Sequence, residues 1–158
     1  MDETLRNRSD GGYLLGDMTL EISYTAIAHA TGGGRDGHVR SEDDRLDFDT
    51  RPPRELGGSG EGTNPEQLFA AGYAACFLSA MHGVAKKLDV DTSDSSVSAS
   101  VGIGGNGDGG YGLAVELDIY TPNVPADRRQ ELADAAHHVC PYSNATRGNV
   151  EVTLTLVD

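Results

Sequence analysis

The sequence contains no tryptophan and only two cysteines, Cys76 and Cys140, among its 158 residues. Two cysteines are too few for the disulfide framework that stabilises many small secreted domains. The first ten residues, MDETLRNRSD, are polar and charged and contain no apolar stretch typical of a signal peptide. We therefore expect a reducing, cytoplasmic location for this chain.

Basic residues are also scarce, since 12 Lys and Arg face 25 Asp and Glu and give a formal net charge of -13. Repulsion between like charges argues against nucleic acid or an anionic membrane as a partner. The longest mostly apolar run, Leu68 to Met81, has 14 residues. A membrane-spanning helix needs roughly 18 to 20 such residues, so this run predicts a buried helix.

Large apolar side chains are few as well. Leu, Ile, Val and Phe together make up only 32 residues, about a fifth of the chain. That fraction lies at the lower limit for a folded protein of high net charge. We therefore expect one domain over residues 17–158, preceded by an N-terminal arm over residues 1–16, and a subunit that needs a partner to complete its core.

The pattern of the remaining residues predicts strands before and after a long helix. Alternating apolar residues predict strands at Thr19 to Ala30, 96–103, 113–120 and 150–156, with two short ones at 38–41 and 46–50. Helical spacing predicts helices over 65–88 and 126–139 and a further turn at 143–148. Strands do not alternate singly with helices, so the fold class is α+β rather than a doubly wound parallel sheet.

The long helix has a clear start at Asn64-Pro65-Glu66. Asn caps exposed N–H groups, Pro suits the first helical position, and Glu in the first turn complements the helix dipole. Its middle, AAGYAAC, is rich in small residues. We expect this helix to be packed on all sides at the centre of the fold.

Two glycine patterns of the form G-x-G-x-x-G occur, at residues 32–37 and 102–107. Each is followed by a predicted strand, whereas a dinucleotide site needs a helix whose N-terminus receives the pyrophosphate. The patterns therefore do not indicate nucleotide binding.

Cys76 lies about eleven residues inside the long helix, where a cysteine is often only a small buried side chain. A reactive thiolate there would need a cation from elsewhere, because the helix dipole acts mainly at the first turn. Arg35 is a candidate because it lies on a glycine-rich loop, and Glu66 could orient its guanidinium through paired hydrogen bonds.

Cys140 leaves two interpretations open. With His137 and Cys76 it could bind a metal ion, although no Cys-x-x-Cys pair supports this and the five histidines are scattered. Together with Cys76 it could instead form a redox-active dithiol, since the expected compartment disfavours a structural disulfide.

Two segments, GTNPEQLFAAGYAACF (62–77) and HVCPYSNATRGN (138–149), closely resemble the signature segments of the organic hydroperoxide resistance (Ohr) branch of the Ohr/OsmC family. The upstream GGGRDG and PPRELGGSGEG also fit, and the resemblance extends over about residues 18–158. It implies an OsmC-like fold in which antiparallel sheets wrap around central helices in an intertwined homodimer.

The resemblance also implies a function, a thiol peroxidase that reduces organic hydroperoxides without metal, flavin or haem. Cys76 matches the peroxidatic cysteine, Cys140 the resolving cysteine, and Arg35 and Glu66 the activating pair. The expected reductant is an external dithiol such as dihydrolipoamide, often carried on a lipoylated protein. Three apolar residues near these positions, Leu56, Phe77 and Met81, are candidates for the substrate pocket.

Two alternatives keep the same fold but remove the catalysis. One is a small-ligand module that binds lipid hydroperoxides or fatty acids without turnover. The other is the metal-binding protein suggested by His137 and the two cysteines.

Overall fold

The computed structural model describes residues 12–15 and 18–158, so most of the expected N-terminal arm lies outside the described residues. The chain divides into two compact units, one ending at Arg51 and one beginning at Pro52. Each unit is described by itself. The division into an arm and a single domain over 17–158 stays a prediction.

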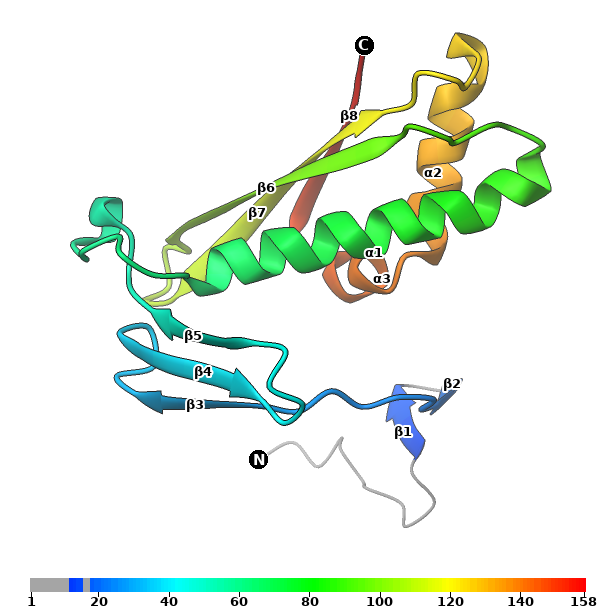
Figure 1. The fold of residues 1–158 in the computed structure, drawn as a ribbon. Helices are drawn as coiled ribbons and strands as arrows, with labels where there is room; N and C mark the ends of the chain where they lie inside the picture. The colour runs from blue at the N-terminus through cyan, green and yellow to red at the C-terminus, as the bar shows by residue number, and fades with distance from the viewer. Residues whose placement is uncertain (1–11, 16–17) are drawn as a thin grey trace. The chain divides into compact units, whose positions relative to one another are not determined.

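The first unit is built from two small antiparallel sheets (Figure 1). Strands β1 (Gly12–Leu15) and β2 (Met18–Glu21) pair with each other. Strands β3 (Ala28–Gly32), β4 (Gly37–Ser41) and β5 (Asp47–Thr50) form a meander, with Val39 opposite Ala30 and Phe48. The strand predicted from Thr19 to Ala30 is wrong in its middle, since residues 22–27 belong to no strand.

The described part of the first unit has little interior of its own. From residue 20 to residue 51, Thr50 is the one side chain classed as buried. Large apolar residues of this unit, by contrast, are exposed: Leu20, Ile22, Tyr24, Ile27 and Leu46. A unit that exposes this much apolar surface relative to what it buries is expected to gain stability by covering it.

The second unit contains the long helix α1 (Pro65–Leu88), which begins and ends where the sequence predicts. Asn64 caps it, accepting a hydrogen bond from the Gln67 backbone N–H at 2.9 Å. The Gln67 side chain accepts one from the Asn64 N–H at 3.2 Å, which completes a capping box. Before α1, the predicted loop holds one short 3-10 helix, Arg54–Leu56.

A three-stranded sheet lies beside α1, with β7 in the middle (Figure 1). Strands β6 (Ser96–Gly105) and β7 (Tyr111–Tyr120) form the predicted antiparallel pair. Strand β8 (Glu151–Val157) pairs with β7 in parallel, so this sheet is mixed rather than purely antiparallel. The expected α+β class is confirmed.

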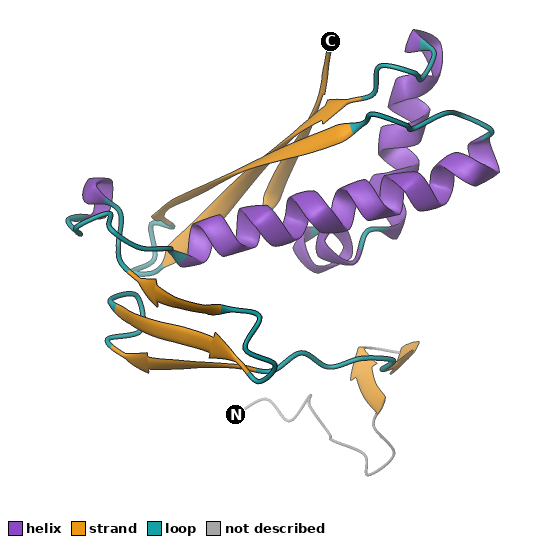
Figure 2. Cartoon of the chain, viewed as in Figure 1, coloured by secondary structure: helices purple, strands orange, loops and turns teal. Residues whose placement is uncertain are grey.

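Two further helices complete the unit (Figure 2). A short 3-10 turn, Ala126–Arg128, leads into α2 (Arg129–Val139), and α3 (Pro141–Thr146) follows directly. The core lies between α1, α2 and the inner face of the sheet. Its fully buried large side chains include Tyr73, Phe77, Met81, Leu117, Ile119 and Leu132.

One face of α1 is not covered by the other elements of the second unit. Ala71, Ala75, Ser79 and Gly83 recur every four residues and are exposed, so the expectation of a helix packed on all sides does not hold within this unit. By length and composition α1 would also pass as a membrane span, a test that the core helix of a globular protein passes too. Because its buried residues pack on the sheet and α2, we interpret α1 as the core helix of this unit.

Candidate active site

The structure brings the two cysteines together, although 64 positions separate them in the chain. The sulfur atoms of Cys76 and Cys140 lie 3.7 Å apart and form no disulfide. Cys76 comes from the middle of α1 and is partly exposed, whereas Cys140 is fully buried. Two thiols at this distance are near enough to form a disulfide of about 2.05 Å after a small shift of the side chains.

Cys140 is held in place by the junction of α2 and α3. It adopts an extended conformation that ends α2 and begins α3, and Pro141 after it occupies the first position of α3. Its backbone N–H donates to the Ala136 carbonyl and its carbonyl accepts from the Asn144 N–H, both at 2.9 Å. These two bonds fix the backbone from which the thiol projects toward α1.

A buried network of hydroxyl groups ties this junction to α1. The Tyr73 hydroxyl lies 2.8 Å from the Ser143 hydroxyl and 3.2 Å from that of Thr146. His137 Nδ1 lies 2.8 Å from the same Ser143 hydroxyl. Tyr73 stands one helical turn before Cys76, and Ser143 follows Cys140 by three residues, so the network braces the backbone around both thiols.

Burial and hydrogen bonding act on the Cys76 thiol in opposite directions. Burial, the largest influence, raises its pKa, and the neighbouring Cys140 thiol raises it further. The backbone N–H of Tyr142 donates to the Cys76 sulfur and lowers that pKa. Within its own unit, therefore, the thiol is positioned but not activated, because the net direction of its pKa is upward.

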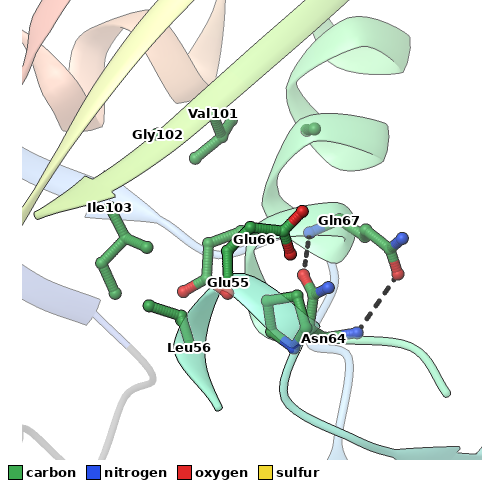
Figure 3. A pocket seen from close by; sticks show the side chains of 10 residues that line it. Glu55, Leu56, Asn64, Glu66, Gln67, Val101, Gly102 and Ile103 are labelled. Carbon is green, nitrogen blue, oxygen red and sulfur yellow. Dashed lines mark hydrogen bonds between the residues drawn. The ribbon is translucent and has the colours of Figure 1, made fainter. Parts of the chain in front are cut away.

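Glu66 lies at the start of α1, on the wall of a groove of about 520 Å³ (Figure 3). The larger apolar side chains of the groove lining are those of Leu56, Val101 and Ile103. Cys76 follows Glu66 by ten positions on α1, a rise of about 15 Å along the helix axis. The Glu66 carboxylate of one chain is therefore not brought to the Cys76 sulfur of the same chain.

Arg35 belongs to the first unit, in the glycine-rich turn between β3 and β4. The buried Thr50 hydroxyl holds this turn at two points, donating to the Gly34 carbonyl at 2.6 Å and accepting from the Gly37 N–H at 3.0 Å. Gly37 is required there, because a Cβ at this position would lie 2.1 Å from the Thr31 carbonyl oxygen. The turn that presents Arg35 is thus fixed by β5.

The other residues considered from the sequence have different surroundings. In residues 12–15 and 18–158, no group of three or more His, Cys, Asp or Glu is arranged to hold a metal ion. Phe77 and Met81 are completely buried in the core, so their expected place in a substrate pocket is wrong. Leu56 is half exposed and does line the groove beside Glu66.

Sequence reasoning missed several contributors. Tyr73, Ser143 and the Tyr142 amide were not singled out, although Tyr73 and Tyr142 both lie inside the two signature segments. The available signal was spacing, since Tyr73 precedes Cys76 by one helical turn and Tyr142 follows Cys140 by two residues.

A partly exposed thiol on a helix that packs against a mixed sheet, close to a second, buried thiol, defines a dithiol protein of the α+β class. Comparisons with known proteins identify the family. The family model described as OsmC-like protein matches residues 58–155. An organic hydroperoxide resistance protein of Xanthomonas axonopodis pv. citri is 56% identical over 137 residues, which cover 86% of this chain and 96% of that protein.

Other relatives carry the same description. Organic hydroperoxide resistance protein OhrB of Bacillus subtilis is 48% identical over 124 residues, 78% of this chain and 91% of that one. The crystal structure of an organic hydroperoxide resistance protein from Legionella pneumophila has a TM-score of 0.83 and 46% identity, covering 87% of this chain and 100% of that chain. The chain belongs to the OsmC-like family, in its organic hydroperoxide resistance branch.

Proposed function

We propose that this protein is a cysteine-based peroxidase that reduces organic hydroperoxides to alcohols and so confers resistance to them. The observation that carries the proposal is the 3.7 Å separation between a partly exposed and a buried sulfur. The names of the relatives supply the substrate class, and the two cysteines supply the chemistry. We assign the peroxidatic role to Cys76 because this residue is partly exposed, whereas Cys140 is fully buried.

The reaction proceeds in three steps. The Cys76 thiolate attacks one peroxide oxygen, the O–O bond breaks, and the alkoxide leaves and takes up a proton to become the alcohol. Cys76 is then a sulfenic acid, which the Cys140 thiol attacks to form a disulfide with loss of water. An external dithiol, such as dihydrolipoamide or a lipoylated protein, exchanges with this disulfide, is oxidised in turn and restores both thiols.

Activation of Cys76 requires a positive charge, because burial raises its pKa within its own unit. We assign this charge to Arg35, oriented by Glu66 through paired hydrogen bonds. The guanidinium would also stabilise negative charge as it develops on the departing alkoxide oxygen.

The distance along α1 argues that the activating pair comes from a second subunit. Glu66 lies about 15 Å along the helix from Cys76 of its own chain, so an antiparallel neighbouring helix would bring it to the other chain's sulfur. The exposed face of α1 (Ala71, Ala75, Ser79 and Gly83) consists of small residues that permit close helix approach. A homodimer that buries this face, in the reducing cytoplasm, fits both observations.

The groove beside Glu66 suits the organic part of the substrate. Its apolar lining, Leu56, Val101 and Ile103, would favour an alkyl or fatty-acid chain over hydrogen peroxide. In the dimer proposed here, this groove would lie next to the partner subunit's reactive sulfur.

The first test counts free thiols and measures the intact mass of the reduced protein before and after one equivalent of cumene hydroperoxide. We expect loss of both thiols within seconds, a mass decrease of two hydrogen atoms, and no crosslink between subunits. In Cys140→Ser, dimedone should label Cys76 as a sulfenic acid. Survival of both thiols would overturn the proposal and return attention to ligand or metal binding.

A second test separates the two possible origins of the activating pair. Cys76→Ser and Arg35→Ala homodimers should each be inactive. When the two are dissociated and reassociated together, a site shared between subunits regains up to one working centre per mixed dimer. A site built within one chain regains nothing, and that outcome would refute the shared arrangement.

A further inference from the structure

The ring of Tyr142 lies against α1 at Gly72, where any larger residue would force the ring to shift. At Gly72, an added Cβ would come within 2.6 Å of the Tyr142 hydroxyl oxygen and 3.1 Å of two ring carbons. The same ring lies edge-on to Phe69, with centroids 6.0 Å apart, and tilted against Tyr73 at 5.6 Å. The Tyr142 side chain is thus seated in a notch of α1 one turn before Cys76.

The backbone of Tyr142 is constrained at both ends of the residue. Its N–H donates to the Cys76 sulfur, and its carbonyl accepts from the Thr146 hydroxyl at 3.0 Å. Because Pro141 has no N–H, this is the first amide of α3 that can donate at all. A hydrogen bond of this kind favours the charged form of the sulfur and therefore the form that reacts.

We propose that Gly72 and the Tyr142 ring are positioning residues, which together hold the Tyr142 backbone N–H on the Cys76 sulfur. The inference rests on the proposed function of Cys76 and adds a second source of activation beside Arg35. This second source differs from Arg35 in origin, because Gly72, Tyr142 and Cys76 all lie in one unit of one chain. The amide therefore acts on the sulfur within a single subunit.

The ring and the amide make different contributions, which substitutions can separate. Gly72→Ala removes the notch, and Tyr142→Ala removes the ring, so both release the constraint on the amide. Tyr142→Phe keeps the ring and its packing and should preserve the constraint. Gly104→Ala on β6 is the control, because it adds a methyl group where nothing lies within 4 Å.

The measurement is the pH dependence of Cys76 alkylation by iodoacetamide, made in a Cys140→Ser background so that one sulfur reacts. A hydrogen bond to a charged sulfur changes its pKa by about one unit, so the thiolate fraction near neutral pH falls about tenfold without it. We expect this shift in Gly72→Ala and Tyr142→Ala. The wild-type midpoint should remain in Tyr142→Phe and Gly104→Ala.

If folded Gly72→Ala kept the wild-type pH midpoint of Cys76 alkylation, the inference would be overturned. Displacing the ring would then have left the Tyr142 amide on the sulfur. If Gly72→Ala does not fold, the α-hydroxy analogue of tyrosine incorporated at position 142 replaces the amide N–H with an ester oxygen and keeps the ring. An unchanged midpoint in that protein refutes the role of the amide, and a raised one supports it. No peroxide enters the assay, so its outcome is independent of whether the protein reduces peroxides.

Discussion

Replacing Ser143 by alanine tests the buried network that braces the two cysteines. The Ser143 hydroxyl is fully buried and contacts both the Tyr73 hydroxyl and His137 Nδ1 at 2.8 Å. After Ser143→Ala, Tyr73 keeps only the longer contact to Thr146, and His137 Nδ1 loses this partner. The two lost hydrogen bonds correspond to a loss of about 2 kcal/mol in the free energy of unfolding.

Tyr73→Phe removes a hydroxyl from the same network at lower cost. Ser143 retains His137, and the Thr146 hydroxyl retains the carbonyls of Tyr142 and Ser143 at 3.0 and 3.1 Å. No partner is left without a hydrogen bond in that variant, so the expected loss is about 1 kcal/mol. The prediction is the order of the two variants rather than either value alone.

Urea unfolding of the reduced proteins measures both losses. The comparison is made at one protein concentration, because association stabilises the folded chain by mass action. Equal slopes with urea would show that the two transitions expose similar surface. If Tyr73→Phe costs as much as Ser143→Ala, the hydroxyl of Ser143 is not the centre of the network and the reasoning is wrong.

Three further predictions concern the turn at Arg35, pH and salt. Thr50→Val removes the two hydrogen bonds from the Thr50 hydroxyl to Gly34 and Gly37 and should speed hydrogen exchange of that turn, measured by mass spectrometry, with a loss of about 1–2 kcal/mol in stability. Burial and the nearby Arg147 lower the pKa of His137. The unfolded chain then binds a proton more readily at this histidine. The free energy of unfolding should therefore decrease as the pH is lowered past about 6.5, and the decrease should be less steep in His137→Gln. Because the net charge is -13, raising NaCl from about 0.05 M to 1 M should screen repulsion and raise Tm in a thermal scan; a lower Tm would contradict this.

Local signals in the sequence predicted local structure well. Asn64-Pro65-Glu66 marked the start of α1, and only the reciprocal bond from Gln67 had to come from the structure. Strands β6 and β7 followed from strict alternation on both sides of a glycine-rich turn. Such features depend on residues close in the chain, which a single sequence displays directly.

Features that depend on distant parts of the chain were predicted poorly. Alternation at residues 22–27 predicted a strand, but the pattern does not reveal whether a neighbouring strand is available to pair. The alternation in the last strand likewise did not reveal that β8 pairs with β7 in parallel. The direction of β8 relative to β7 depends on the path of the chain through α2 and α3.

Predictions about the candidate site divide in the same way, between features that depend on nearby residues and features that depend on distant ones. The proximity of Cys76 and Cys140 was implied by the family resemblance, since helical and strand patterns carry no information on two residues 64 positions apart. The separation of Glu66 from Cys76, in contrast, follows from the rise of a helix whose bounds the sequence had predicted.

Under the proposed function, the unequal exposure of the two cysteines would set the order of events when the disulfide is reduced. In a disulfide between them, a thiol arriving from solvent could approach the Cys76 side, whereas Cys140 is enclosed by the core. The mixed disulfide with the reductant would then form on Cys76, and Cys140 would depart as the leaving thiolate. The Cys76 sulfur would thus meet both the oxidant and the reductant from the same partly exposed side, and the buried Cys140 would meet neither.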